Sequence, residues 1–311
     1  MHMTGLPDFR TSGLPTFRTS RLLDFWTSNL PDFQPSRLHI FYKNMEAASV
    51  ITSTQNPKIK HLTLLQQKSS ERRRAGLFVI EGAREFLHCL HSGFEVSTLF
   101  VCPELLQGYE GAAEILSLLN SGQGYEVSRK VYEHIAYRGS TEGVIAEMKS
   151  RLTTLDDLHL PANPLIIVLE SVEKPGNLGA VLRSADAADA DAVIVCDPLT
   201  DLFNPNLIRS SIGAIFTVPT VACTSEDCIA FLKAKGIRIL TAQLQDSHLY
   251  YDTDMRQGTA IVMGTESTGL TNIWRNAADA HIRIPMKGKL DSLNVSVSAA
   301  ILLFEAVRQR G

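Results

Sequence analysis

From residue 50 onward, short apolar runs alternate with segments in which apolar residues recur every three or four positions. Runs of about four to eight apolar residues have the length of buried strands, whereas the three-to-four spacing is that of an amphipathic helix. Up to residue 150 the pattern predicts strands at 77–82, 98–102 and 143–148, and helices after Asn56-Pro57 and at 83–92 and 112–119. Such alternation predicts a small α/β domain.

The pattern resumes after residue 163 and continues to the C-terminus. It predicts strands at 165–169, 192–195, 214–218, 238–241, 260–263 and 280–284, and helices at 179–188, 226–235 and 296–309. Apolar strands separated by helices indicate a buried, mostly parallel sheet. The sequence thus predicts two α/β domains, at 45–150 and 164–311, joined by a polar linker at 151–163.

The first 44 residues follow a different pattern, in which a Leu-Pro-Asp-Phe-like unit recurs every eight residues between Leu6 and Phe33. This period fits neither a helical heptad nor the roughly 20–50-residue unit of a solenoid, and its prolines interrupt any helix. We interpret residues 1–44 as a disordered tail, or as translated upstream repeat DNA with the natural start at Met45. A short linear interaction motif is the functional alternative.

Composition excludes several classes of protein. The chain is 44% hydrophobic and 20% charged, as in globular proteins, and no apolar run reaches the roughly 18–20 residues of a membrane span. We therefore expect a cytoplasmic protein with no membrane partner. The five cysteines are Cys89, Cys102, Cys196, Cys223 and Cys228. No two of them form a CxxC pair, so we expect free thiols and no metal site.

The net charge of −3 means that any binding of nucleic acid must depend on local positive charge. One segment has such an excess, with only Glu71 and Glu81 opposing it. Its basic residues are Lys58, Lys60, Lys68, Arg72, Arg73, Arg74 and Arg84. They form either a phosphate-binding strip or an ordinary solvated helix face.

A first candidate motif, Glu-Lys-Pro-Gly-Asn-Leu-Gly-Ala-Val-Leu-Arg at 173–183, follows an apolar strand and opens a helix. A glycine-rich turn at a helix N-terminus lets a ligand approach the backbone and favours an anion. Asn177 lies in this turn and Arg183 on the helix. The alternative reading is a capped helix with a surface arginine.

A second motif, Gly-Thr-Glu-Ser-Thr-Gly at 264–269, directly follows the strand at 260–263. Its glycines, Gly264 and Gly269, bracket Glu266 at the carboxyl end of a strand, where open α/β sheets bind their ligands. The alternative is a strand-to-helix turn that Glu266 caps.

The third motif runs from Ile284-Pro-Met286 to Ser292-Leu293-Asn294-Val-Ser and opens the last helix. Serine and asparagine compete for backbone hydrogen bonds and so favour caps and special turns. Pro285 ends the preceding strand, whose backbone groups then need other partners. An ordinary capped helix is the alternative reading.

Together, in this order and spacing, the three motifs resemble the SpoU/TrmH family of SPOUT methyltransferases over residues 164–305. The segment Asn204-Pro-Asn…Ile-Arg209-Ser-Ser-Ile-Gly213 also resembles that family, and we expect Arg209 to contact RNA. Residues 56–82 are similar to its N-terminal, ribosomal-protein-like RNA-binding domain. The expected fold class is therefore α/β, with a small substrate-binding domain and a C-terminal parallel-sheet SPOUT domain.

The resemblance further implies a trefoil knot in the C-terminal domain and a homodimer. Its activity would be S-adenosylmethionine-dependent methylation of a ribose 2′-hydroxyl, in ribosomal RNA rather than transfer RNA, without a metal. The cofactor would be held near Leu244, Gly264, Ile284, Met286 and Leu293. The residues lining the reacting groups would be Asn177, Arg183, Glu266, Ser292 and Asn294.

We expect Arg183 to clamp a phosphate rather than act as a base, because an arginine is effectively always protonated. Two other functions compete. A non-catalytic RNA-binding paralogue would keep the same fold but bind no cofactor. A nucleotide-dependent Rossmann enzyme is disfavoured because the chain lacks the GxGxxG fingerprint.

Overall fold

The computed structural model describes residues 50–137, 142–265, 268–289 and 292–311. Residues Ala48–Gly311 form one compact unit, the second of two along the chain, and every element below belongs to it. Our expectations for residues 1–44 lie outside the described residues, as does Glu266.

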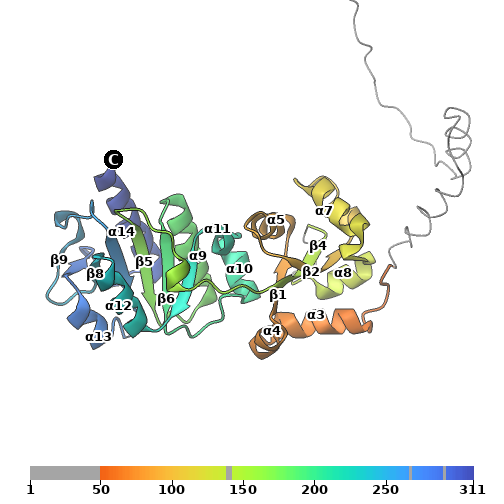
Figure 1. Ribbon diagram of the computed structural model, residues 1–311, viewed down its shortest axis with the longest axis horizontal. Coiled ribbons are helices and arrows are strands. Elements are labelled where there is room, and N and C mark those ends of the chain that lie inside the picture. Colours follow the sequence, from red (N-terminus) through yellow and green to blue (C-terminus); the bar gives the residue numbers. More distant parts are fainter. Residues whose placement is uncertain (1–49, 138–141, 266–267, 290–291) are drawn as a thin grey trace, which may run out of the picture. The chain divides into compact units, whose positions relative to one another are not determined.

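The N-terminal part of the second unit is built on a four-stranded mixed sheet in the order β1-β4-β2-β3. Figure 1 labels three of its strands, β1, β2 and β4. Its strands are β1 (Leu77–Glu81), β2 (Val96–Val101), β3 (Gly124–Glu126) and β4 (Val144–Lys149). Its helices are α3 (Pro57–Gln67), α4 (Ser69–Ala75), α5 (Ala83–His91), α6 (Pro103–Leu106), α7 (Ala112–Leu118) and α8 (Arg129–Ile135), with a π-helical segment at Leu119–Gln123. β4 is antiparallel to both β1 and β2, and β3 is parallel to β2. The predicted small α/β domain is confirmed.

Local sequence explains where helix α3 begins. Asn56 precedes it and accepts a hydrogen bond from the Lys58 backbone N–H at 2.9 Å, and Pro57 occupies the first helical position. Asparagine at the cap with proline next is a favoured helix start, because proline has no N–H to leave unpaired.

The C-terminal part contains a seven-stranded sheet in the order β7-β6-β5-β10-β8-β11-β9, in which all paired strands are parallel. Its strands are β5 (Leu165–Glu170), β6 (Ala192–Cys196), β7 (Thr220–Cys223), β8 (Arg238–Ala242), β9 (His248–Leu249), β10 (Thr259–Met263) and β11 (Ala280–Arg283). Every residue of β5, β6 and β10 is buried, which confirms the predicted parallel sheet.

Helices cover both faces of this sheet. They are α9 (Pro175–Ala187), α10 (Pro205–Ser211), α11 (Ala214–Thr217), α12 (Ser225–Ala234), α13 (Asn272–Ala277) and α14 (Val295–Arg310), with short 3-10 turns at Leu155–Asp157 and Tyr250–Asp252. Ile167 of β5 packs on the side of α9 and α14, whereas its neighbours Ile166 and Val168 pack on the side of α12 and α13. The alternation of side chains along each strand therefore assigns its residues to two cores.

One predicted strand is wrong. Residues 214–218 form α11 and the turn after it, and the strand expected there is β7, which begins at Thr220. Ile212 and Gly213 both adopt left-handed backbone conformations, with φ of 56° and 84°, and these end α10 and start α11. Short apolar runs suit a buried helical turn as well as a strand, so periodicity alone could not decide.

The two parts share a continuous hydrophobic core. The Phe78 ring of β1 stacks on Phe203 with centroids 4.3 Å apart and lies 5.8 Å from Phe216. The predicted linker follows this seam, where Thr153 forms a β-bridge to Val221. Thr153, within the predicted linker, thus pairs with the edge strand of the C-terminal sheet.

Candidate active site

The first and third motifs meet at the N-termini of α9 and α14. Asn294 is the N-cap of α14, and its Oδ1 accepts hydrogen bonds from the Ser296 N–H at 3.0 Å and the Ser296 hydroxyl at 2.6 Å. Its Nδ2 donates to Oδ1 of Asn177, in the first turn of α9, at 3.1 Å. One side chain therefore caps a helix and also ties two segments that are far apart in sequence.

Arg183 lies farther along α9 and is exposed. No carboxylate within the described ranges forms an ion pair with its guanidinium. An exposed arginine without an ion-pair partner among the described residues is suited to bind a phosphate, because its guanidinium can donate two parallel hydrogen bonds.

The two described ends of the second motif pack closely against each other after β10. A Cβ atom on Gly264 would overlap the carbonyl group of Gly269 and come within 2.5 Å of the Leu270 backbone nitrogen. Thr265 pairs with Gly269 in a β-bridge, and its hydroxyl lies 2.7 Å from that of Thr268. Gly264 is therefore required by this close backbone approach, whatever the ligand.

Glu170, a residue that sequence reasoning missed, fixes the far end of this loop. It is the last residue of β5 and is buried, and its carboxylate accepts hydrogen bonds from the Thr271 N–H at 2.9 Å and the Thr271 hydroxyl at 2.6 Å. The available signal was an acidic residue at the end of an otherwise apolar strand, because a buried carboxylate needs specific partners.

The residues expected to hold the cofactor follow the carboxyl ends of three neighbouring strands. Gly264 follows β10, Leu244 follows β8, and Ile284 and Met286 follow β11. Leu293, just before α14, is 39% exposed and Leu244 is 48% exposed. Such apolar surface at the carboxyl edge of a parallel sheet fits a flat heterocycle.

Gln243 gives a second indication of a ligand at this edge. Its Oε1 is buried and has no hydrogen-bond partner in the part of the chain that the structure describes, while its Nε2 donates to the Gln245 carbonyl at 2.9 Å. A buried acceptor without a donor is unfavourable, so a ligand N–H or hydroxyl beside Leu244 would satisfy it.

The basic strip is not uniform. Lys58, Lys60, Arg73 and Arg84 are exposed, with Lys58 over the Tyr125 ring and Arg84 3.1 Å from Glu85. Arg74 is exposed but forms an ion pair with Glu71 at 2.6 Å, and its hydrogen bond holds the pKa of Glu71 below the usual value. These side chains remain accessible to a phosphate.

Arg72 differs from its neighbours, and its geometry argues against the expected phosphate contact. Its side chain is only 5% exposed, and Nε donates to Asp201 at 2.7 Å while Nη1 donates to the Leu65 carbonyl at 2.7 Å. The helix turns Arg72 inward, where it joins the N-terminal part to the loop after β6. Its positive charge is paired with Asp201 inside the protein.

Arg209, at the end of α10, lies beside Tyr137 and Glu81. Its guanidinium lies 3.9 Å from the centre of the Tyr137 ring, and Nη2 is 3.4 Å from the Glu81 carboxylate. A groove of about 430 Å³ opens here, lined also by Asn204 and Asn206. A guanidinium stacked on an exposed aromatic ring is a surface on which a base can stack.

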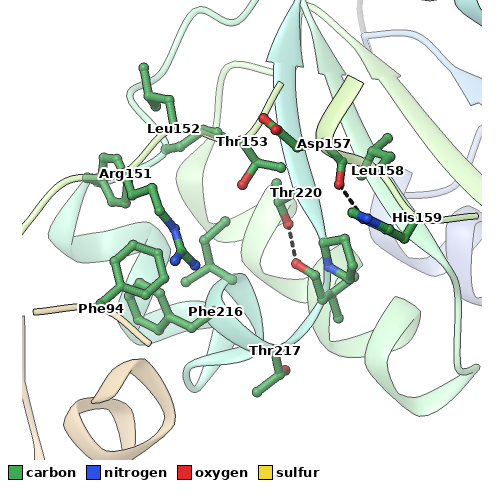
Figure 2. Close-up of a pocket in the computed structure, with 15 residues that line it drawn as sticks. Phe94, Arg151, Leu152, Thr153, Asp157, Leu158, His159, Phe216, Thr217 and Thr220 are labelled. Carbon is green, nitrogen blue, oxygen red and sulfur yellow. Dashed lines mark hydrogen bonds between the residues drawn. The ribbon is translucent and has the colours of Figure 1, made fainter. Parts of the chain in front are cut away.

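A separate cavity of about 290 Å³ lies along the seam between the two parts (Figure 2). Arg151 places its guanidinium 4.9 Å from the Phe94 ring centre, and Thr220 donates to the Val218 carbonyl at 2.9 Å. The cavity is lined by none of the residues of the three motifs. It is therefore not the site that those motifs form.

Comparison with known proteins places these features in one family. Residues 164–304 match the model of the SpoU rRNA Methylase family, and residues 56–146 match an MRM3-like substrate binding domain. No helix in the described ranges is both long and apolar enough to cross a membrane.

Curated relatives cover most of the chain. A 23S rRNA (uridine(2479)-2′-O)-methyltransferase of Streptomyces viridochromogenes is 31% identical over 85% of this chain and 93% of its own length. A 23S rRNA (guanosine-2′-O-)-methyltransferase RlmB of Vibrio vulnificus is 38% identical over 60% of this chain and 77% of its own. An AdoMet-bound rRNA methyltransferase from Sinorhizobium meliloti superposes with a TM-score of 0.75, at 31% identity, over 83% of this chain and 97% of that one.

Proposed function

Because the chain belongs to the SpoU rRNA methylase family, we propose that it transfers a methyl group from S-adenosylmethionine to a ribose 2′-hydroxyl of ribosomal RNA. The observation that carries this proposal is the hydrogen bond from Asn294 to Asn177. It joins the first and third motifs into one polar site, with the exposed Arg183 on the same helix as Asn177. The named relatives modify 23S ribosomal RNA, which supports the choice of RNA.

The cofactor residues fit the group they are proposed to hold. Leu244, Ile284, Met286 and Leu293 would contact its adenosine portion, and Gly264, whose backbone packs directly against Gly269, would position the backbone beside it. The buried Gln243 acceptor would receive a hydrogen bond from it. When bound, the sulfonium supplies an activated methyl group, so the reaction needs no metal.

The chain's own residues then position the hydroxyl. We assign Arg183 to the phosphate next to the reacting ribose and to stabilising the developing negative charge on the 2′-oxygen. Asn177 and Asn294 hold the two helix N-termini in place. Ser292, two residues before Asn294, and Glu266 are assigned as further polar contacts on the family resemblance of their motifs. An arginine side chain has no free acceptor for a proton, so the proton of the 2′-hydroxyl passes to another acceptor or to solvent.

Arg183→Lys tests this role. The variant keeps the charge but loses the two-pronged hydrogen-bonding geometry, so kcat/KM should fall at least about tenfold while cofactor affinity stays unchanged. Incorporation of labelled methyl groups into ribosomal RNA, followed by mapping of 2′-O-methyl nucleotides, measures the first quantity, and calorimetry the second.

Arg256→Ala is the matched control. Among the described residues this exposed arginine pairs with Asp254 alone, and its hydrogen bonds hold the pKa of Asp254 well below the usual range. It should keep full activity. Near-wild-type turnover of Arg183→Lys would exclude the clamp. If the wild type bound the cofactor but methylated no ribosomal RNA, the proposed substrate itself would be wrong.

RNA outside the reacting nucleotide is assigned to the N-terminal part and to Arg209 of α10 beside it. The exposed Lys58, Lys60, Arg73, Arg74 and Arg84 would contact the phosphate backbone, and Arg209 with Tyr137 would receive a base. Arg72 is left out of this surface because it is buried. The family match of residues 56–146 to a substrate binding domain supports the assignment.

We extend the proposal to the assembly and the topology. Val297 and Phe304, seven residues apart on α14, are each 47% exposed, which supports a homodimer packed through this helix. Family membership, with β10 lying between β5 and β8, supports a trefoil knot formed by the segments after β10 and β11. The five free cysteines suit the reducing cytoplasm.

A further inference from the structure

Three cysteines that are scattered in sequence converge at one edge of the large sheet. Cys196 is the last residue of β6, Cys223 the last residue of β7, and Cys228 lies in the first turns of α12. Cys196 and Cys223 are directly paired across the two strands. The three Sγ atoms all lie within 4.8 Å of one another.

We propose that Cys196, Cys223 and Cys228 form a binding site for a thiophilic metal cation, with Zn²⁺ as the best-fitting ion. Zinc–thiolate bonds of about 2.3 Å in a tetrahedral site separate the sulfurs by about 3.8 Å, which the observed cluster allows with small side-chain movements. The expectation of no metal site rested on the absence of a CxxC pair in the sequence. The fold nevertheless brings three cysteines that are distant in sequence within reach of one ion.

The burial of the three thiols fits three protein ligands and one open position. Cys196 and Cys228 are fully buried, whereas Cys223 is partly exposed and lines a shallow surface groove. Asp197 and Asp227 line the same groove. A cation can therefore enter past Cys223, and the negative charge of the two carboxylates favours it there.

Hydrogen bonds hold the segment that carries two of the ligands. The Ser225 hydroxyl donates to Asp197 at 2.6 Å and accepts from the buried Trp274 indole N–H at 2.9 Å. Thr224 caps α12, and its hydroxyl donates to Asp227 at 2.8 Å. Ligands fixed in this way by outer hydrogen bonds need little rearrangement when a metal binds.

The site is distinct from the methyl-transfer site. β7 is at one edge of the sheet, whereas the proposed cofactor residues follow β10, β8 and β11 on the other side of β5. A bound cation would join β6, the edge strand β7 and helix α12. Its expected effect is therefore on stability, since an ion that binds only the folded chain raises its unfolding temperature.

The test is a titration of the reduced, chelator-treated full chain with Co²⁺ as a spectroscopic probe. We expect saturation at a single ion per chain, a thiolate-to-cobalt charge-transfer band in the near ultraviolet, and loss of the band when Zn²⁺ is added. Zn²⁺ should also raise the melting temperature. In Cys223→Ser, which retains size and lies at the partly exposed position, affinity should fall at least about tenfold.

Cys102→Ala is the control, because this thiol lies in the N-terminal part, outside the cluster. It should keep the band and the melting shift. Cobalt binding without the charge-transfer band, or binding unchanged in Cys223→Ser, would overturn the proposal. So would a protein that binds no cobalt but forms a disulfide within the cluster after treatment with peroxide, which would make the site a redox one.

Discussion

Gly264 has no Cβ atom, and this allows the backbone of Gly269 to pack directly against it after β10. Any Cβ would overlap the backbone of Gly269, which no side-chain rotation can relieve. Gly264→Ala should therefore displace the loop and weaken S-adenosylmethionine binding by at least about tenfold, equivalent to ~1.4 kcal/mol. Calorimetric titration measures the affinity. A normal dissociation constant in a folded variant would show that the loop does not contact the cofactor.

Individual residues also show what a sequence can and cannot reveal. The motifs predicted that Asn177 and Asn294 belong to one site, and the structure brings them into hydrogen-bond contact. The sequence could not show that Arg72 is buried whereas Arg73 and Arg74 are exposed. Which arginine faces the core depends on how helix α4 is rotated about its axis, and tertiary packing sets that rotation. Glu170 escaped notice because its partner, Thr271, is remote in sequence.

Among whole elements, the strands that are buried on both faces were the most predictable. Continuous apolar runs marked β5, β6 and β10, since no helix of ordinary length fits them. The run at 214–218 was misread because the decisive feature is the left-handed backbone of Ile212, a non-glycine residue. Short polar elements such as β3 and α8 were missed because tertiary packing, rather than periodicity, stabilises them.

Helix α9 packs closely against α10 at Gly179. A Cβ there would overlap the Ser210 hydroxyl and lie 2.8 Å from the Ser210 backbone carbon, so Gly179→Ala should force the helices apart. We expect a loss of about 1–3 kcal/mol in the free energy of unfolding, despite the better helix propensity of alanine. Gly176→Ala, on the same helix with open space around its Cβ, is the control and should not destabilise. Equal denaturation midpoints for both variants would contradict this account.

For the whole molecule, the ion pair between Arg72 and Asp201 links the N-terminal part to the C-terminal domain. Both side chains are largely buried, at 5% and 13% exposure. Removing one partner leaves a buried charge, so Arg72→Ala should cost about 3 kcal/mol in the free energy of unfolding. Adding Asp201→Ala should cost less than the sum of the single changes, which a double-mutant cycle in urea measures. Strict additivity would mean that the pair contributes no coupling.

The proposed homodimer predicts that the exposed apolar face of α14 is buried between two copies of the chain. Phe304 and Val297 expose apolar surface on α14, the helix whose N-terminus is capped by Asn294, so dimerisation would tie the active site to the assembly. Phe304→Asp places a charge in that interface, and an interface cannot bury an unpaired carboxylate without a large cost. We expect the variant to self-associate at least about a hundredfold more weakly than the wild type, as measured by analytical sedimentation.

Leu199→Asp, at a residue that is 62% exposed outside α14, is the matched control and should remain dimeric. A wild type that stays monomeric at micromolar concentration, or a Phe304→Asp variant that stays dimeric, would show that this helix face has another purpose. If methyl transfer falls together with the dimer while the variant unfolds normally, the active site depends on both subunits.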